Sequence, residues 1–479
     1  MPLSHRLFAS GPSAKLALIT LVFLTFGSFT SCSAGKDGDG GTTDHITITG
    51  DVGYCPGDSM RLYQVLGPVT EQIASGKIET DAGKSTFTID ADLPEQGLYS
   101  IGLNARQAKT FLLGDASEVT LTGNCQNPSQ SFAIAGSALN DGYQNLMNLV
   151  ITHNQKLQQL QQNMQIFQQA DPAQIPRIQQ EMQTENTTHA ARLDSILKRG
   201  DIVSKYASLY NFRNFGSNPD DQTKYGNPNK HFQATWFDGL DLNDPVIAKA
   251  PQLFEKSQYY AMTLSQITGP EDAKASLFEQ LSKAQEGSTS HQSMLKGYLS
   301  GLEQRKSDLY VDFGEMFVAQ YPTDPINPTV KANVSRIQAL MVGNVAPNIS
   351  SSTPEGGTLA LEELRGKVVM IDFWASWCRP CRAENPNVVK AYNKYSSAGF
   401  EILGVSLDKD KNKWLQAIAA DGLTWKHISD LGGWGSQPAA AYGVNSIPAT
   451  FLLDRDGKII AKNLRGPALE NKLAEIFGY

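Results

Sequence analysis

Two cysteines separated by two residues, Cys378 and Cys381, constrain this chain more than any other feature of its sequence. They follow an apolar, strand-like run at 368–374 and precede a helical pattern, which places the first thiol at the start of a helix. Unpaired backbone N–H groups and the positive end of the helix dipole favour the thiolate at that position. Because the thiolate is the nucleophile in disulfide exchange, the pattern predicts a redox-active pair between a strand and a helix.

Other uses of a cysteine pair fit the neighbouring residues less well. A zinc site takes four ligands, but the chain has no second close pair of cysteines, and His427 is the only histidine after His291. Attachment of a c-type haem needs a histidine directly after the second cysteine, where this chain has Arg382. We therefore predict no metal and no cofactor, and a purely structural disulfide remains the alternative for the pair.

Length and composition set the broad class of the protein. The 479 residues exceed what one hydrophobic core holds, so several domains are expected. An apolar fraction of 41% is ordinary for a soluble globular chain, and the net charge of −7 argues against a nucleic acid as partner.

Residues 1–31 have the features of an export signal. Basic residues precede an apolar stretch at 16–26 that is too short to span a bilayer. Small residues then lead to Cys32, which resembles the lipidated first residue of a mature lipoprotein. A plain secretory signal and a retained anchor are the alternatives, and all three place the mature chain outside the cytosol. We expect a lipid-anchored protein in the envelope of a Gram-negative bacterium, facing the periplasm or the outer surface.

The pattern of apolar residues changes along the rest of the chain. Residues 32–43 are Gly-rich and polar, which predicts a flexible tether. Residues 44–136 alternate apolar and polar side chains between Gly-rich turns, which predicts an all-β sandwich. Residues 137–340 carry apolar stripes at helical spacing and predict an α-helical domain, whereas 341–479 mix strand and helix patterns and predict an α/β domain.

Two histidines and two further cysteines in these regions are candidates for chemistry. His153 and His189 fall on the apolar stripes of consecutive helices, so we interpret them as seam residues rather than ligands. Cys55 and Cys125 lie in turn-like settings and are candidates for a structural disulfide in an oxidising compartment, with two unpaired thiols as the alternative. The β region otherwise shows no catalytic constellation, and the helical region fits a spacer, a dimer surface or a client platform.

The last third of the chain resembles the thioredoxin superfamily. The segments that carry the resemblance are 366–369, the Trp-Cys-x-Pro-Cys centre at 377–381, 446–450 and the strand–turn–strand pattern at 451–459. Their details resemble the envelope-anchored thiol–disulfide oxidoreductases, which include the cytochrome c maturation reductases and belong with the AhpC-TSA and redoxin proteins. The resemblance implies a C-terminal α/β domain of thioredoxin fold, which follows a β sandwich and a helical region in the sequence.

The same resemblance assigns roles to five residues. Cys378, normally the exposed member of such a pair, would exchange with the client disulfide, and Cys381 would resolve the mixed disulfide. Asp372 corresponds to the buried proton acceptor of thioredoxin, and Glu384 to the active-site glutamate of the maturation reductases. A buried carboxylate has a raised pKa, which suits it to exchange a proton with Cys381 near neutral pH. Pro448 is expected to follow a cis peptide bond.

Four more residues are expected to face the client. Trp377 would shape access to the sulfurs, and the charge of Arg379 would favour the thiolate of the neighbouring cysteine. Pro380 restricts the first helical turn. The cis peptide bond expected before Pro448 would expose the backbone of Ile447 for strand-like pairing with a client peptide.

The expected activity is reduction of disulfides in client proteins, because the relatives with a residue like Glu384 are reductases. An upstream electron donor in the membrane would then restore the dithiol. Thiol peroxidase activity is one alternative, although Ala375 and Ile371 stand where peroxiredoxins have a hydroxyl residue and a proline. A non-catalytic envelope adaptor is the other.

Overall fold

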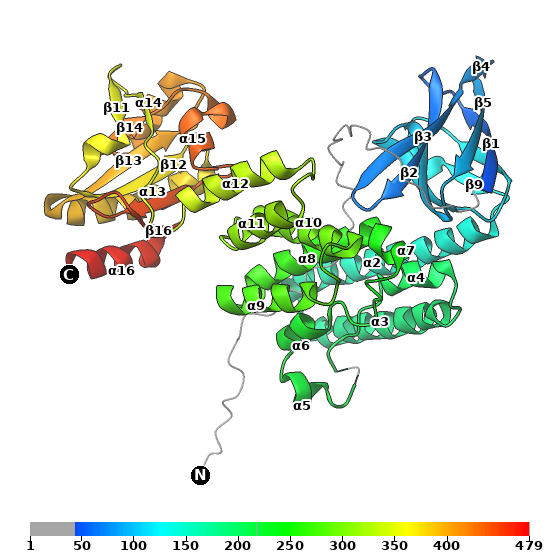
Figure 1. Cartoon of the computed structure of the whole chain (residues 1–479). Helices are drawn as coiled ribbons and strands as arrows, with labels where there is room; N and C mark the ends of the chain where they lie inside the picture. Colours follow the sequence, from blue (N-terminus) through cyan, green and yellow to red (C-terminus); the bar gives the residue numbers. More distant parts are fainter. Residues whose placement is uncertain (1–43, 217, 479) are drawn as a thin grey trace, which may run out of the picture. The chain divides into compact units, whose positions relative to one another are not determined.

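The computed structural model describes residues 44–216 and 218–478, and Figure 1 shows the order of the elements. The leader predicted at 1–31, the lipidation site Cys32 and the tether at 32–43 lie outside the described residues. Within the described part of the chain, no helix combines the length and the apolar character needed to cross a bilayer.

The chain divides into two compact units, Met1–Leu309 and Tyr310–Tyr479. The division falls before residue 341, where the sequence predicts the start of the α/β domain. Two helices that pack against each other, α11 (Tyr310–Gln320) and α12 (Asn327–Ala339), belong to the second unit. Apolar spacing predicted that this stretch is helical, but spacing carries no information about which neighbours a helix joins.

The β region forms two sheets around one apolar core, which confirms the predicted sandwich. The first sheet has the order β4-β5-β1-β8-β9 and the second the order β3-β2-β6-β7. Every second side chain of β5 is buried, and residues from both sheets form one cluster. The elements are β1 (Asp44–Gly53), β2 (Ser59–Leu66), β3 (Val69–Lys77), β4 (Glu79–Asp81), β5 (Lys84–Leu93), β6 (Gly97–Asn104), β7 (Gln107–Leu113), β8 (Glu118–Gly123), α1 (Pro128–Ser131) and β9 (Ala133–Ala135).

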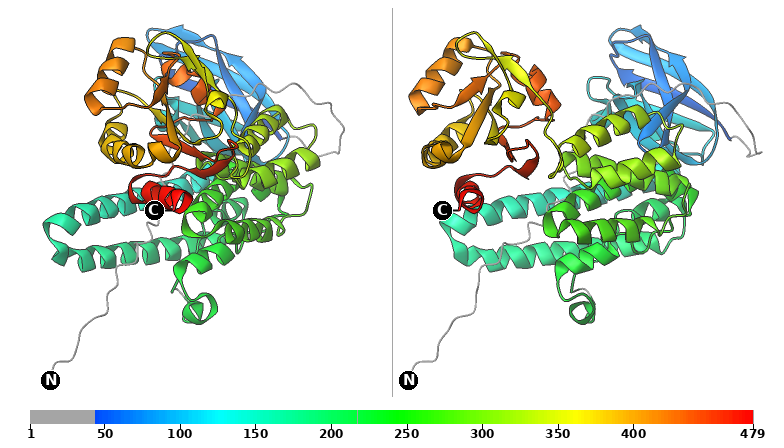
Figure 2. Two further views of the ribbon diagram at one scale, coloured as in Figure 1. Left: turned by 90° about the vertical axis from the view of Figure 1, so that its left-hand side faces the viewer. Right: turned by 60° about the vertical axis from the view of Figure 1, so that its left-hand side comes forward.

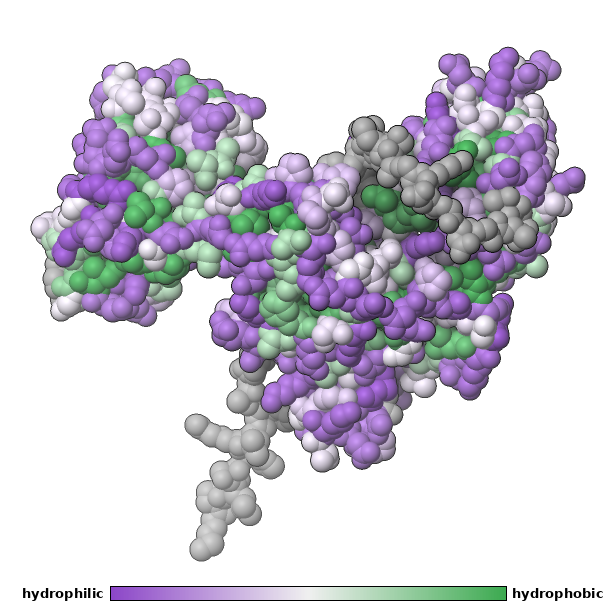
Figure 3. All heavy atoms as spheres, in the orientation of Figure 1, coloured by the Kyte–Doolittle hydropathy of each residue, from purple (hydrophilic) through white to green (hydrophobic). Residues whose placement is uncertain are grey.

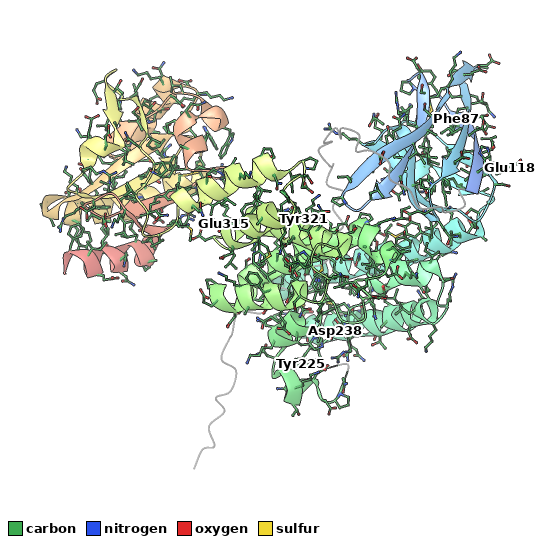
Figure 4. The ribbon with its side chains drawn as sticks, viewed as in Figure 1. Phe87, Glu118, Tyr225, Asp238, Glu315 and Tyr321 are labelled. Carbon is green, nitrogen blue, oxygen red and sulfur yellow. A yellow bond between two sulfur atoms is a disulfide. The ribbon has the colours of Figure 1, made fainter. Side chains whose placement is uncertain are left out.

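Two local features close this sandwich. Gly50 in β1 pairs with Phe87 in β5, and a Cβ atom at residue 50 would lie 2.0 Å from the Phe87 ring, which Figure 4 labels. Glycine is therefore required where the ring crosses the strand. Cys55 and Cys125 are joined by a disulfide, and each residue is 3% exposed. The structure thus selects the paired state over the two unpaired thiols.

The helical part of the first unit begins with a long hairpin. Ser137 is the N-cap of α2, because its Oγ accepts the backbone N–H of Asn140 at 3.0 Å. In Figure 2, α2 and α3 run side by side. The helices are α2 (Ala138–Ala170), η1 (Pro172–Gln174), α3 (Ile175–Leu197), α4 (Ile202–Ser208), α5 (Asp221–Tyr225), α6 (Pro228–Thr235), α7 (Pro245–Lys249), α8 (Pro251–Ile267), α9 (Pro270–Leu281) and α10 (Thr289–Gln304).

The two histidines predicted on the helix seam do lie there. The rings of His153 and His189 stack with their centroids 3.8 Å apart, and His153 Nδ1 is 3.0 Å from a carboxylate oxygen of Glu185. No group of three or more potential metal ligands occurs among the described residues. The stacked rings and the contact with Glu185 of α3 place these histidines between α2 and α3.

The C-terminal unit contains a five-stranded mixed sheet of order β14-β13-β12-β15-β16. The central strand β12 is parallel to β13 and antiparallel to β15, and all its residues are buried. The elements after α12 are β10 (Ser350–Ser352), β11 (Thr358–Ala360), η2 (Leu361–Leu364), β12 (Val368–Trp374), α13 (Arg379–Tyr395), η3 (Ser396–Ala398), β13 (Phe400–Ser406), α14 (Lys411–Asp421), β14 (Lys426–Ile428), η4 (Gly433–Gly435), α15 (Gln437–Ala441), β15 (Ala449–Leu453), β16 (Ile459–Lys462) and α16 (Gly466–Phe477).

This sheet brings two distant loops together. Because β12 and β15 are antiparallel, Phe373 near the end of β12 pairs with Ala449 at the start of β15. The loop that follows β12 ends at Cys378, one turn before Cys381 of α13, and the loop that precedes β15 carries Pro448. On the face drawn in Figure 3, hydrophilic residues dominate and apolar residues are scattered, as on ordinary protein surfaces.

Candidate active site

The cysteine pair lies at the start of α13, where the sequence predicts it. Cys378 is the N-cap of the helix, and its sulfur accepts the backbone N–H of Cys381 at 3.2 Å. The two cysteines are joined by a disulfide. A sulfur that already accepts a hydrogen bond from a helix N-terminus is stabilised as a thiolate once the disulfide opens.

The resemblance implies that Cys378 is the exposed member of the pair, and the structure contradicts this. Cys378 is 4% exposed and Cys381 is 2% exposed, so both are buried in the oxidised chain. The reason lies in the cap geometry, because the sulfur of an N-cap residue turns back over the first helical turn instead of pointing to solvent. The outer cysteine is thus recognised by its position at the helix start and not by its exposure.

Asp372 lies in the middle of the sheet beside the redox pair. It belongs to β12, where it pairs with Gly404 of β13 and Thr450 of β15, and it is 6% exposed. Burial raises the pKa of its carboxyl from 3.8 to about 7, with Arg465 acting to lower this pKa and Glu384 to raise it. The carboxyl therefore changes its protonation state near neutral pH.

One small cavity connects the acid to the inner sulfur. Its volume is about 10 Å³, which is close to the space that a single water molecule needs. Asp372, Cys381 and Glu384 all contribute to its wall, so proton exchange among them requires no large movement. The other lining residues are Met370, Asn385, Val388, Pro448, Thr450, Leu464 and Arg465.

Glu384 lies one turn after Cys381 on α13 and contacts the first residue of α16. Its Oε1 accepts the backbone N–H of Gly466 at 2.6 Å, and its Oε2 accepts an amide hydrogen of Asn387 at 3.1 Å. The carboxylate is thus fixed at the edge of the cavity by a backbone group from another part of the domain.

The loop before β15 has the conformation that the resemblance implies. The peptide bond between Ile447 and Pro448 is cis, and both residues are half-buried. The Arg465 guanidinium donates a hydrogen bond to the carbonyl oxygen of Pro448. Arg465 was not predicted as a site residue, because a single arginine before a helix start has no distinctive sequence signal.

Two more acids, which no sequence pattern indicated, hold the loop after β12 and the first turn of α13. Asp408 is 1% exposed and accepts the backbone N–H and the hydroxyl of Ser376 at 2.9 and 2.5 Å. Asp421, at the end of α14, accepts a guanidinium hydrogen of Arg382 at 2.6 Å. Charge-assisted hydrogen bonds of this kind thus fix the chain on both sides of the cysteines.

The residues predicted to face a client are at the surface. Trp377 is 53% exposed, and Arg379 and Pro380 are exposed at the start of α13. Ile447 is half-buried beside the cis bond. Their roles toward a client remain predictions.

Comparisons with known proteins give consistent results. Residues 342–462 match the AhpC/TSA family. Over 141 residues the chain is 31% identical to the thiol-disulfide oxidoreductase ResA of Bacillus cereus, a match that covers 29% of this chain and 79% of that protein. For the thiol-disulfide oxidoreductase ResA of Geobacillus thermodenitrificans the identity is 37% over 121 residues. This match covers 25% of this chain and 68% of that protein. The solved thioredoxin domain of a thiol-disulfide oxidoreductase from Bacteroides vulgatus is 35% identical, covers 29% of this chain and 99% of that chain, and has a TM-score of 0.28.

Proposed function

Since this chain belongs, through its C-terminal domain, to the thioredoxin-like thiol–disulfide oxidoreductases, we propose that it reduces disulfides of client proteins in the cell envelope. The observation that carries this proposal is the cysteine pair at a helix N-terminus with a buried acid in the cavity behind it. A reductase needs a stabilised outer thiolate and a route for the proton of the inner thiol, and this arrangement supplies both.

The proposed reaction transfers two electrons from the dithiol to the client. The Cys378 thiolate attacks one client sulfur, and the other client sulfur leaves as a thiolate that takes a proton. Cys381 then gives its proton to the ionised carboxylate of Asp372, directly or through the cavity, and attacks Cys378. This second step releases the reduced client and leaves the disulfide seen in the structure.

Restoring the dithiol needs two electrons from outside the protein. We propose that a thiol-containing donor in the membrane supplies them and that Cys32 carries the lipid that keeps the protein near this donor. The disulfide between Cys55 and Cys125 supports a compartment outside the cytosol, because disulfides with a structural role are rare in the reducing cytosol.

The thiol peroxidase alternative gains no support from the site. Ile371 and Ala375, which stand in place of the proline and the hydroxyl residue of peroxiredoxins, are both fully buried apolar side chains. They provide no hydroxyl group to bind a peroxide next to Cys378.

A turnover assay with the full-length protein tests the proposal. Dithiothreitol-driven reduction of insulin is expected for the wild type and is expected to be lost in Cys378→Ser. Cys381→Ser should instead accumulate a covalent complex with the client, because the mixed disulfide is not resolved. The double variant Cys55→Ala/Cys125→Ala removes the other disulfide and is the control, with rates compared per folded molecule. Consumption of peroxide by Cys381→Ser, without reduction of insulin by the wild type, would favour the peroxidase.

A further inference from the structure

Two tryptophans that are distant in the sequence lie together beside the redox pair. Trp377 directly precedes Cys378, and Trp434 lies in the turn η4 between β14 and α15. Their ring centroids are 5.9 Å apart, and each residue is 53% exposed. Among the described residues, seven large apolar side chains are strongly exposed, and the two tryptophans of that set form this pair. Such a pair next to a reactive sulfur calls for an explanation beyond ordinary surface scatter.

The backbone that presents Trp377 is held in place. Ser376 donates its backbone N–H and its hydroxyl to the buried carboxylate of Asp408, and its carbonyl oxygen accepts a guanidinium hydrogen of Arg382 at 3.2 Å. On the other side, Cys378 is fixed as the cap of α13. The indole is therefore exposed on an ordered segment.

The turn that carries Trp434 is also closed by hydrogen bonds. The carboxylate of Asp430 accepts the backbone N–H of Gly432 at 3.0 Å and that of Gln437 at 2.8 Å, on the two sides of the tryptophan. Gly433 has a φ of 59°, a left-handed conformation that glycine adopts without strain. Both rings are thus presented by ordered backbone, so covering them costs little additional conformational entropy.

We propose that Trp377 and Trp434 bind an apolar side chain of the client, at a residue that flanks the client cysteine. The inference rests on the proposed reductase function and adds a substrate preference to it. While a client sulfur is bonded to Cys378, the residues next to the client cysteine are within reach of Trp377, and the adjacent indole of Trp434 enlarges the apolar surface. Covering two half-exposed indoles with an aromatic or aliphatic side chain removes apolar area from water. Tryptophans that become buried when a partner binds contribute strongly to protein–protein recognition.

Two matched peptides test this preference. Each contains one disulfide, and they differ only in having Phe or Gly next to the first cysteine. The full-length protein is reduced, freed of reductant and mixed with each peptide in a single turnover, so that its dithiol is oxidised as the peptide gains two thiols. Rates are divided by those of dithiothreitol with the same peptide, which removes the intrinsic reactivity of the disulfide.

The wild type is expected to reduce the Phe peptide at least about fivefold faster than the Gly peptide. Trp434→Ser should bring this ratio below about twofold, and Trp434→Phe should restore most of it, because the aromatic surface returns. Val345→Ser is the matched control and should keep the full ratio. Val345 is 54% exposed, and it pairs with Lys458. Pro448 precedes β15 and Lys458 follows it, so Val345 lies at the other end of that strand from the site.

Three results would overturn the inference. Equal rates for the two peptides with the wild type would show that no apolar preference exists. A preference that survives Trp434→Ser would place it elsewhere on the protein. Failure to reduce either peptide, together with no reduction of insulin, would remove the proposed function and this preference with it.

Discussion

Asp372 and Cys381 line the same cavity of about 10 Å³, although one belongs to the central strand β12 and the other to the helix α13. The carboxyl has a pKa of about 7 because burial disfavours its charged form. A group that gains and loses a proton near neutral pH thus lies beside the sulfur that the proposed reductase reaction requires to be deprotonated.

Replacing this acid should slow turnover while leaving the cysteines in place. Asp372→Asn cannot accept a proton, so we expect insulin reduction near pH 7 to fall by about 100-fold and the inflection near pH 7 in the pH–rate profile to disappear. Asp456→Asn, at an exposed aspartate of the turn before β16, is the control. An Asn variant with the rate and pH profile of the wild type would rule out proton transfer through Asp372.

Replacing the two charged neighbours of Asp372, Arg465 and Glu384, should move its pKa in opposite directions. In the oxidised protein, a carboxyl titration followed by carbon NMR should give a midpoint near 7 for Asp372. Arg465→Met removes a positive charge that stabilises the ionised form, so the pKa should rise. Glu384→Gln removes a negative charge, so it should fall. In both variants the midpoint should stay above the ordinary value of 3.8, because burial is the largest cause.

The same titration has a consequence for stability. Between pH 4 and pH 7 Asp372 is protonated in the folded chain but ionised in the unfolded chain, so its contribution to the free energy of unfolding falls as pH rises through this range. Asp372→Asn removes this pH-dependent loss. Between pH 4 and pH 8 its free energy of unfolding should therefore rise relative to that of the wild type, by up to about 4 kcal/mol. Hydrogen exchange of the β12 amides at both pH values measures the difference. A pH-independent difference would mean that the carboxyl is not protonated in the folded state.

Removal of the disulfide in the sandwich should destabilise the β region without changing the redox chemistry. The bond joins residues separated by 70 positions, and closing a loop of this size stabilises a fold by about 4 kcal/mol. Cys55→Ala/Cys125→Ala should therefore make the strands of residues 44–135 more sensitive to protease. The rate of insulin reduction per folded molecule should not change. Unaltered protease resistance would show that the sandwich core alone is sufficient.

The parts of the site that are local in the sequence were predictable. Asp372, the two cysteines and Glu384 lie within thirteen positions on one strand and one helix, so the order of elements fixes their proximity. The sandwich followed from strict alternation, as in β5, where every second residue is buried. The resemblance, and not the spacing, indicated the cis bond before Pro448.

The residues that were missed reach the site through the tertiary fold. Asp408 follows β13, Trp434 lies after β14 and Arg465 precedes α16, so each depends on how the strands are ordered in the sheet. A lone Asp, Trp or Arg in a loop has no spacing pattern that indicates a partner. The exposure of Cys378 was misjudged for a related reason, since the direction of an N-cap side chain depends on the cap geometry and not on residue type.

A donor that serves the proposed reductase cycle would encounter two disulfides in one polypeptide and would have to open only one of them. Shielding from solvent does not distinguish the bonds, because Cys55 and Cys125 are each 3% exposed and Cys378 is 4% exposed. The backbone distinguishes them, since Cys378 caps a helix that stabilises a departing thiolate, whereas the helix that follows Cys125 in the sequence is capped by Asn127. Selective reduction would then follow from secondary structure, and the Cys55–Cys125 bond would persist while the Cys378–Cys381 bond opens and closes.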